Sequence, residues 1–380
     1  MDSNSNTPKY KTIIDDILER IQRNDFTYDV PICTEQSLMD EYGVSRITAT
    51  RALTELLQKG ILYRKRGVGS FVTKSVSMNN LPKAPSAADP KTISFLIPFD
   101  LTTPLVSEIV KIVTDGLSEH GYFMNVYICN ASLSREKANI KLLLSQNPSG
   151  IIYLPFRDKI FINLLNEFVM QNKPVIILDK HTDCPYIHNI TSDNFEGGRL
   201  LTEHLTSLGH RNITFFTTAP VEDVSSVRNR FGGYLDGLHR SGLSPNPRNL
   251  VYLPCDLGNE PSDEFPNPQI VSFLKKSYEQ GVTAILTEND IVADYLCRAC
   301  VQLGFRIPED FSISGFDDTD FARRFPGGIT TVKQDYPAIA VELLNVLNET
   351  LTNPAAGICR KTVPVSLIIR SSTGPARITD

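Results

Sequence analysis

Carboxylate and amide side chains recur where short apolar runs end in the larger, C-terminal part of the chain. Asp100, Asp179, Asn289 and Asp317 each follow such a run. Groups of this kind could serve as general acids and bases, bind Mg²⁺, or satisfy the hydroxyl groups of a small polyol. Each could also simply cap a turn. These residues predict a polar site at strand ends, and the features around them must decide its chemistry.

No assembled catalytic constellation accompanies these residues. The sequence has no phosphate-binding glycine loop, no Gly-x-Ser-x-Gly turn and no complete dinucleotide-binding glycine pattern. Cys297 and Cys300 form a Cys-x-x-Cys without a second pair, which favours two buried thiols. The pair 197–198 of glycines could cradle a phosphate, but close helix packing is the more ordinary use. We predict no catalytic residue, metal or cofactor; a metal-dependent sugar-modifying enzyme using Asp317 and Asp318 stays as the alternative.

An alternation of strands and helices must position the polar residues. Predicted helices such as 104–119, 135–145 and 195–208 lie between short apolar runs. The predicted strands are 93–98, 124–129, 150–154, 175–178, 213–217, 284–287 and 311–314. This α/β pattern predicts parallel sheets with helices on both faces and a ligand beyond the carboxyl ends of the strands. Residues 92–380 are many for one sheet, so we expect two lobes around a cleft.

A smaller unit, residues 1–74, precedes this part and reads as three helices and a hairpin. The first predicted helix spans 10–23, the second begins after Pro31 with Thr34 as its N-cap, and Ser45 caps the third. The predicted hairpin pairs strands 61–64 and 70–73. In the third helix one face is apolar, comprising Ala49, Ala52, Leu53 and Leu56. The opposite face therefore points outward, with Arg46, Ile47, Thr50 and Arg51 on it.

Basic residues are concentrated in the second half of this unit. The chain carries a net charge of −5, yet residues 42–76 have seven basic residues and one acidic residue. Such a local positive block favours a phosphate-binding surface. A helix that follows a short turn and exposes arginine and hydroxyl groups is typical of a recognition helix in the major groove of DNA. The basic hairpin tip would then lie beside the DNA backbone.

The segment TEQSLMDEYGVSRITATRALTELLQKGILYRKRGVGSFV resembles the winged helix-turn-helix head of GntR-type transcription regulators. The resemblance implies that Arg46, Thr48 and the wing around Gly67–Ser70 touch double-stranded DNA. Gln36 and Thr50 stand where many members carry arginine, which affects the operator sequence. The full predicted DNA-binding set is Thr34, Gln36, Ser45, Arg46, Ile47, Thr48, Thr50, Arg51, Lys65, Arg66, Gly67, Gly69 and Ser70.

The segments SDNFEGGRLLTEHLTSLGHRNITFF, AILTENDIVADYLCRACVQLGFRIPEDFSISGFDDTDFA, GGITTVKQDY and VSLIIRSSTG are similar to the effector domain of LacI/GalR-type repressors. The resemblance implies a two-lobed, periplasmic-binding-protein-like fold that binds a sugar or nucleobase between its lobes. The effector-binding residues that we expect are Asp100, Asp179, Arg230, Asn289, Asp317 and Gln334.

A proline-containing linker, residues 75–91, joins the two units, and it has no counterpart of the LacI hinge helix. This fusion resembles the architecture of arabinose-repressor-type regulators. With residues 92–380 as the effector-binding and dimerisation domain, we predict a ligand-responsive DNA-binding repressor of carbohydrate-utilisation genes. A bound monosaccharide would release it from DNA. A phosphorylated sugar or a nucleobase stays open as the effector, as does activation in place of repression.

Composition bears on location and partners. The sequence contains no run of about 18 apolar residues and no apolar segment near its first residues, so we expect neither a membrane span nor secretion. Seven scattered cysteines suit a reducing compartment. We therefore predict a cytoplasmic homodimer. A pure sugar-transport component conflicts with the basic head and with the missing signal segment.

Overall fold

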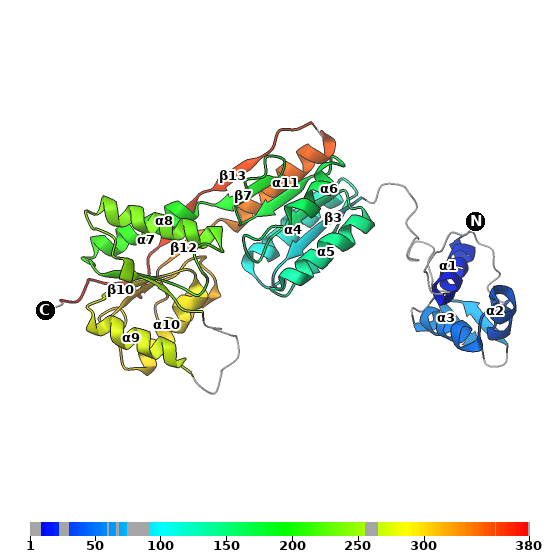
Figure 1. Cartoon of the computed structure of the whole chain (residues 1–380), viewed down its shortest axis with the longest axis horizontal. Coiled ribbons are helices and arrows are strands. Elements are labelled where there is room, and N and C mark those ends of the chain that lie inside the picture. Colours follow the sequence, from blue (N-terminus) through cyan, green and yellow to red (C-terminus); the bar gives the residue numbers. More distant parts are fainter. Residues whose placement is uncertain are drawn as a thin grey trace. The chain divides into compact units, whose positions relative to one another are not determined.

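The computed structural model describes residues 9–22, 30–58, 61–65, 68–73, 91–254, 265–353 and 355–378. The chain divides into two compact units, Met1–Asp89 and Pro90–Asp380. Figure 1 colours the first unit blue and the second from cyan to red. Apart from Lys91, the predicted linker lies outside the described residues.

The N-terminal unit is built from three helices and an antiparallel hairpin, as the sequence predicted. Its elements are α1 (Lys9–Gln22), α2 (Glu35–Tyr42), α3 (Arg46–Gln58), β1 (Leu62–Lys65) and β2 (Gly69–Val72). The apolar face of α3 is buried against α1 and α2. Ala49, Ala52 and Leu56 are 0% exposed, which confirms the predicted inward face of this helix.

The predicted helix caps are present. Thr34 is the N-cap of α2, where its hydroxyl accepts a hydrogen bond from the amide of Ser37 and the Ser37 hydroxyl accepts one from the amide of Thr34. Gly43 closes α2 with a φ of +57°, a backbone conformation that glycine adopts at little cost. The Ser45 hydroxyl accepts from the amide of Thr48 at 3.4 Å, at the start of α3. These caps determine the angle at which α3 leaves the turn.

The large unit has two lobes. The first lobe is a six-stranded parallel sheet in the order β13-β7-β6-β5-β3-β4. Helices α4 and α11 share one core on one face, and α5 and α6 share another. The bounds are β3 (Thr92–Ile97), α4 (Pro104–Ser118), β4 (Phe123–Ile128), α5 (Leu133–Gln146), β5 (Gly150–Tyr153), α6 (Ile162–Val169), β6 (Val175–Leu178), β7 (His188–Ser192), α11 (Tyr336–Thr352) and β13 (Arg360–Val363).

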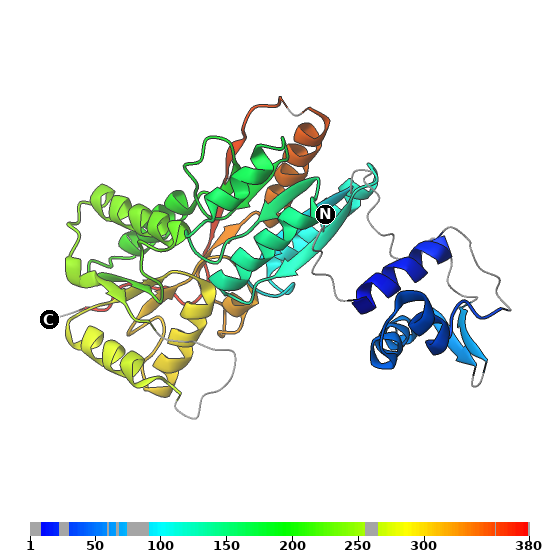
Figure 2. The ribbon, with the colours of Figure 1, turned by 45° about the vertical axis from the view of Figure 1, so that its right-hand side comes forward.

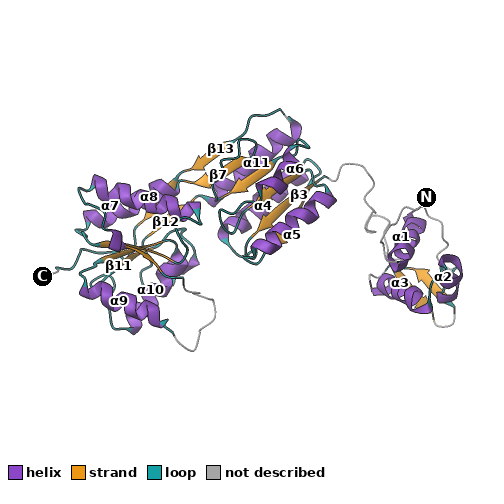
Figure 3. Ribbon diagram, in the orientation of Figure 1, coloured by secondary structure: helices purple, strands orange, loops and turns teal. Residues whose placement is uncertain are grey.

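The second lobe is a four-stranded parallel sheet in the order β11-β10-β8-β9. In Figure 3, α7 and α8 lie on one side of this sheet, while α9 and α10 lie on the other. The bounds are α7 (Asn194–Ser207), β8 (Ile213–Thr217), α8 (Ser225–Arg240), η1 (Pro247–Asn249), β9 (Leu250–Tyr252), α9 (Pro268–Glu279), β10 (Ala284–Thr287), α10 (Asp290–Gln302), β11 (Ser312–Ser314) and η2 (Asp320–Arg323).

The chain crosses between the lobes three times. It passes from β7 into α7, from β12 (Thr331–Gln334) into α11, and from β13 into β14 (Val365–Ile368), and β12 pairs with β14 in a small antiparallel sheet. Figure 2 shows the ribbon turned by 45° about the vertical axis from the view of Figure 1. The predicted parallel sheets and two lobes are confirmed. None of the helices that the structure describes is long and apolar enough to cross a membrane.

Candidate effector cleft and nucleic-acid interface

Four of the predicted effector-binding residues meet where the strands end. Asp317 follows β11, Arg230 lies in α8 and Gln334 ends β12. The Nη2 atom of Arg230 is 3.2 Å from Oδ1 of Asp317, and Nε2 of Gln334 donates to the same oxygen at 2.6 Å. Asp179, after β6 of the other lobe, is close enough to Arg230 for their charges to interact. We call these four residues the cleft cluster.

Arg230 is held rigidly despite its charge. Its side chain is 6% exposed, and its guanidinium carbon lies 3.7 Å from the ring centroid of Phe316. Its Nε donates to Oδ1 of Asn194 at 2.8 Å, and Nη1 donates to the carbonyl of Glu288. A buried guanidinium needs such partners, because an unpaired buried charge is strongly destabilising. These contacts fix the orientation of the guanidinium plane.

The first lobe contributes an ion pair to the same region. Lys180, 7% exposed, pairs with the carboxylate of Asp179 and donates to the Ser226 hydroxyl of α8 at 3.3 Å. Burial acts to raise the pKa of Asp179, but Lys180, together with Arg230, outweighs burial and holds the pKa below its usual value. Asp179 is therefore an ionised acceptor. Its φ of +63° is uncommon for a residue with a side chain.

Strain and burial also mark the second lobe's side of the cleft. Asp317 has a φ of +109°, and burial raises the pKa of its carboxyl although Arg230 opposes this. Asp290, fully buried, accepts from the amide and hydroxyl of Thr319 and from the hydroxyl of Thr331 in β12. Burial, with a contribution from Asp317, raises the pKa of Asp290 to about 7. Backbone strain of this kind concentrates at functional sites.

The other two predicted effector-binding residues cap local structure. The side chain of Asn289 is the N-cap of α10 and accepts from the amide of Val292 at 3.0 Å. Asp100 is exposed, and its Oδ1 accepts from the amide and hydroxyl of Thr102. The hydrogen bond from the Thr102 hydroxyl is the main cause that lowers the pKa of Asp100. Among the described residues, neither Asn289 nor Asp100 shares a hydrogen bond or ion pair with the cleft cluster.

The predicted set of effector-binding residues left out Ser192 and Asn194, which bond to members of the cleft cluster, and Lys180, which pairs with Asp179 at the same strand end. Ser192 donates to the carboxamide oxygen of Gln334, and Asn194 holds Arg230. Ser192 ends β7, a strand that the apolar pattern did not predict, and Asn194 begins α7 two residues later. The usable signal was the run Ser192-Asp193-Asn194 just before a helix, which brings polar side chains to a strand end.

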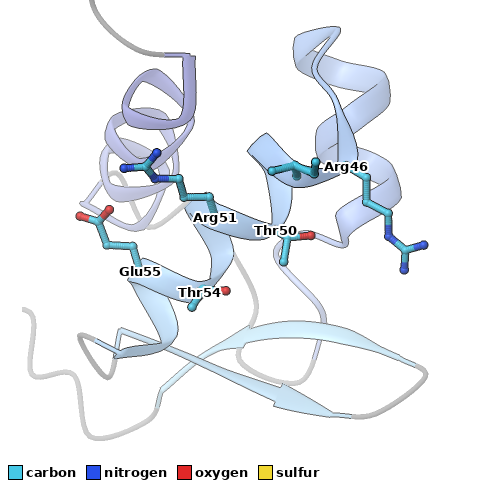
Figure 4. A pocket seen from close by; sticks show the side chains of 6 residues that line it. Arg46, Thr50, Arg51, Thr54 and Glu55 are labelled. Atoms are coloured by element: carbon cyan, nitrogen blue, oxygen red, sulfur yellow. The ribbon is translucent and has the colours of Figure 1, made fainter.

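The N-terminal unit presents the outer face of α3. Ile47 is 83% exposed and Arg46 is exposed, while Thr50 is half-buried. Figure 4 shows Arg46, Thr50 and Thr54 along a shallow hollow on this face. On this face, Arg46 and Thr50 can donate hydrogen bonds to base edges and phosphates, and the apolar side chain of Ile47 is exposed to water. This combination suits the major groove of DNA.

Glu35 connects α3 to the hairpin. Its Oε2 is 3.2 Å from Nε of Arg46, and its Oε1 is 2.8 Å from Nη2 of Arg64 in β1. The hydrogen bond from Arg64 is the main cause that lowers the pKa of Glu35. One carboxylate thus orients two cations on the same surface, and sequence reasoning did not single out either Glu35 or Arg64.

Two other predicted cations contact aromatic rings. The guanidinium carbon of Arg51 lies 4.0 Å from the ring centroid of Tyr10 in α1, and Figure 4 shows this side chain directed toward α1. The ammonium of Lys65 lies 4.9 Å from the ring centroid of Phe71. Both side chains are exposed. Stacking of this kind fixes the position of a cation without neutralising it.

The remaining predicted DNA contacts have diverse surroundings. Gln36 is exposed and donates to Asp40 at 2.9 Å. Thr34, Ser45 and Thr48 form the caps described above, and the hydroxyls of Ser45 and Thr48 are 3.0 Å apart.

In the hairpin, Gly69 packs against Pro31, and a Cβ there would lie 2.7 Å from the Pro31 Cβ. Ser70 is 1% exposed in this structure, so its hydroxyl is not presented to a ligand. Arg66 and Gly67 lie outside the described residues.

The two cysteines of the Cys-x-x-Cys motif are buried in α10, as predicted. Both are 0% exposed, and burial raises the pKa of the Cys300 thiol to about 12 and that of Cys297 well above its usual value. Within the described ranges, no three histidine, cysteine, aspartate or glutamate side chains come together in a way that could hold a metal ion. Thiols in such surroundings behave as core side chains.

Fold and site together define a class: a winged helix-turn-helix head joined to a two-lobed ligand-binding unit. Comparison with known families agrees. Residues 9–72 match the gntR family of bacterial regulatory proteins, and residues 202–373 match the periplasmic binding protein-like domain. The chain therefore combines a GntR-type DNA-binding domain with a periplasmic-binding-protein-like domain, and the architecture predicted from the sequence is confirmed.

Individual relatives share the whole arrangement. The chain is 27% identical over 379 residues to the arabinose metabolism transcriptional repressor of Geobacillus stearothermophilus, covering 96% of this chain and 98% of the relative. It is 25% identical to the repressor of the same name from Halalkalibacterium halodurans, covering 91% of each. Among solved structures, a LacI family regulator from Enterococcus faecium with bound ribose is similar with a TM-score of 0.62 and 24% identity, covering 75% of this chain and 100% of that one.

Proposed function

We propose that this protein is a transcriptional repressor of carbohydrate-utilisation genes, and that a monosaccharide bound between its lobes lowers its affinity for operator DNA. The cleft cluster is the observation that carries the proposal. Arg230, Asp317, Gln334 and Asp179 offer fixed donors and acceptors at one point between two lobes. Such groups are what vicinal hydroxyls need, since a buried unpaired hydroxyl is costly. The arabinose-metabolism relatives support the same assignment.

The charge balance of the cleft favours an uncharged ligand over a phosphorylated one. Asp179 is paired with Lys180, and Arg230 with Asp317, so each cation already has an anionic partner. A phosphate would need a cation that is not neutralised in this way. Pentoses are the first ligands to try, because the relatives are named for arabinose metabolism and the similar regulator from Enterococcus faecium holds ribose.

For DNA binding we propose a surface made of the outer face of α3 and the hairpin. Arg46 can donate two hydrogen bonds to guanine, Ile47 can contact a thymine methyl group, and Thr50 and Lys65 can reach phosphates. We leave Ser70 out of this surface because its side chain is buried. The proposed domain limits are 1–74 for the head, 75–91 for the linker and 92–380 for the effector domain.

The protein would act as a cytoplasmic homodimer and not as an enzyme. DNA in a bacterial cell lies in the cytoplasm, and a dimer holds two heads over two operator half-sites. Closure of the lobes around the sugar would change the dimer geometry and the spacing of the heads. The relatives named as transcriptional repressors support regulation in place of catalysis.

Reciprocal binding tests this proposal. The purified full chain would select its operator from a random DNA library, and thermal unfolding would identify the effector among arabinose, ribose, other monosaccharides, sugar phosphates and purines. A ligand at 100 times its dissociation constant adds about 2.7 kcal/mol to the stability of the state that it binds. Operator must then weaken sugar affinity by the same factor by which sugar weakens operator affinity. Equal sugar affinities with and without operator would contradict the proposed repression mechanism.

A further inference from the structure

The two lobes are joined by a group of polar contacts at the first turn of α8, apart from the cleft cluster. Asp158 lies in the loop after β5 of the first lobe, and Ser225 begins α8 of the second. Oδ1 of Asp158 accepts from the Ser225 amide at 2.8 Å and from its hydroxyl at 2.7 Å. Oδ2 of Asp158 is 3.2 Å from Nη1 of Arg228. A single carboxylate thus engages an amide, a hydroxyl and a guanidinium of the opposite lobe.

Neighbouring residues reinforce the same junction. The amide of Asp158 donates to the carbonyl of Asp223 at 3.0 Å, and Nη1 of Arg157 is 3.1 Å from a carboxylate oxygen of Asp223. From the loop after β6 of the first lobe, the amide of His181 donates to the Ser225 hydroxyl at 2.8 Å. Ser225, 1% exposed, is therefore contacted by two separate segments of the opposite lobe.

Asp158 also completes α8. The first amides of a helix have no partner within the helix, and an oxygen-bearing side chain at the N-cap ordinarily satisfies one of them. The N-cap of α8 is Val224, whose side chain has no polar atom. The Asp158 carboxylate supplies the missing acceptor from the other lobe, where its charge also interacts favourably with the helix dipole. Separation of the lobes would remove this cap from α8.

The loop that carries Asp158 is fixed to its own lobe. Glu136 of α5, 0% exposed, accepts from the amide of Phe156 and from the hydroxyl of Tyr153, each at 2.8 Å. The contacts of Asp158 therefore join the first lobe, through this anchored loop, to α8 of the second lobe. Arg230 lies on the same helix, less than two turns beyond Ser225, so the cap and the cleft cluster move with one element.

We propose that Asp158 is a positioning residue that raises the population of the closed lobe arrangement before the effector binds, through its cap of α8 and its ion pair with Arg228. We call these contacts of Asp158 with Ser225 and Arg228 the latch. The latch does not depend on the proposed function; only its effect on effector affinity rests on the proposed function. Effector affinity depends on the population of the closed state, because a binding-competent state populated at one tenth weakens apparent affinity about tenfold.

Hydrogen–deuterium exchange of the ligand-free full chain tests the latch. Asp158→Ala is compared with wild type and with Glu222→Ala, which removes an exposed carboxylate near α8 whose backbone carbonyl, not its side chain, contacts Arg228. If the cap is lost but the lobes stay together, exchange becomes faster only in the first turn of α8. An opened cleft also speeds exchange at 178–182, where the His181 amide is bonded across the junction. We expect at least a threefold rise there for Asp158→Ala and none for Glu222→Ala.

Ser225→Ala provides a second, milder variant, since it removes only the hydroxyl that bonds Asp158 and His181. Unchanged exchange at 178–182 in both variants, with both sheets still protected, would overturn the proposal. Isothermal titration of the monosaccharide that stabilises wild type should give about tenfold weaker binding for Asp158→Ala. If no monosaccharide binds wild type, the proposed function fails, while the exchange measurement still decides the latch.

Discussion

The Nη2 atom of Arg230 lies 3.2 Å from a carboxylate oxygen of Asp317, and the same guanidinium lies over the ring of Phe316, just after β11. Helix α8 and the strained loop at Asp317 are thereby joined at the centre of the candidate effector cleft. The pair brings together two residues that are far apart in the sequence and that we propose to belong to one site.

Arg230→Ala should destabilise the protein and abolish its response to effector. Removal of one partner from a buried ion pair costs about 3–5 kcal/mol, which lowers the unfolding midpoint by roughly 10 °C in a unit of this size. Differential scanning fluorimetry with and without the effector measures both effects. Arg240→Ala is the control, because Arg240 lies on the same helix but is exposed and pairs with Asp236. Equal midpoints for the two variants would contradict a structural role of the Arg230–Asp317 pair.

Asp290 should make stability fall as pH rises toward neutrality. Its folded-state pKa is about 7, above the value of about 3.9 expected in an unfolded chain. Between these values the folded state binds the extra proton, so the free energy of unfolding declines with rising pH by at most about 1.4 kcal/mol per unit. Above pH 7 this contribution is gone. Denaturant unfolding at pH 5, 6, 7 and 8 should show a shallower slope below pH 7 for Asp290→Asn than for wild type. Identical slopes would show that Asp290 does not titrate there.

Gly198→Ala should be strongly destabilising because α7 and α8 pack with their backbones in contact. A Cβ at residue 198 would lie 2.1 Å from the carbonyl oxygen of Arg230. Relief of such a clash needs a backbone shift, which typically costs 1–3 kcal/mol or more. Gly357→Ala is the matched control, because a Cβ there meets no described atom within 4 Å. Urea denaturation distinguishes the two, and a neutral Gly198→Ala would contradict the packing.

Arg46→Ala should weaken operator binding and relax preference at one base pair, by about 1–3 kcal/mol if the side chain reads a base edge. Lys65→Ala should weaken binding to all sequences and reduce the dependence of affinity on salt, because a phosphate contact releases counterions. Fluorescence anisotropy at several salt concentrations separates these outcomes. Lys137→Ala, outside the head, is the control for net charge. Unaltered affinity of Arg46→Ala would place this residue outside the interface.

Removal of Glu35 tests how Arg46 is oriented. Glu35→Gln keeps the shape of the side chain but loses the charge that pairs with Arg46 and Arg64. We expect lower discrimination between operator variants, with nonspecific affinity equal or higher because a negative charge has left the surface. Competition binding against random DNA measures the ratio. Unchanged discrimination would show that Arg46 orients itself on DNA without Glu35.

Local patterns were sufficient for the head. Four apolar side chains on one face of α3 determine which face is outward, and Thr34 and Gly43 mark the ends of α2 through bonds within a few residues. The ion pair between Glu35 and Arg64 could not be predicted from the sequence, because β1 comes next to α2 only in the folded structure. Charge spacing along the chain does not report such a pair.

In the large unit, the sequence by itself determined the alternation of strands and helices, and therefore the parallel sheets, the two lobes and the polar strand ends. Periodicity and turn residues are local properties, and the carboxyl ends of parallel strands share one edge. Only the tertiary structure decided which polar residues meet. Asp179, Arg230, Asp317 and Gln334 converge because three crossing segments interleave the lobes, whereas Asp100 and Asn289 satisfy nearby backbone amides. The contact of Asp158 with α8 likewise depends on the position of one lobe against the other, which no local pattern encodes.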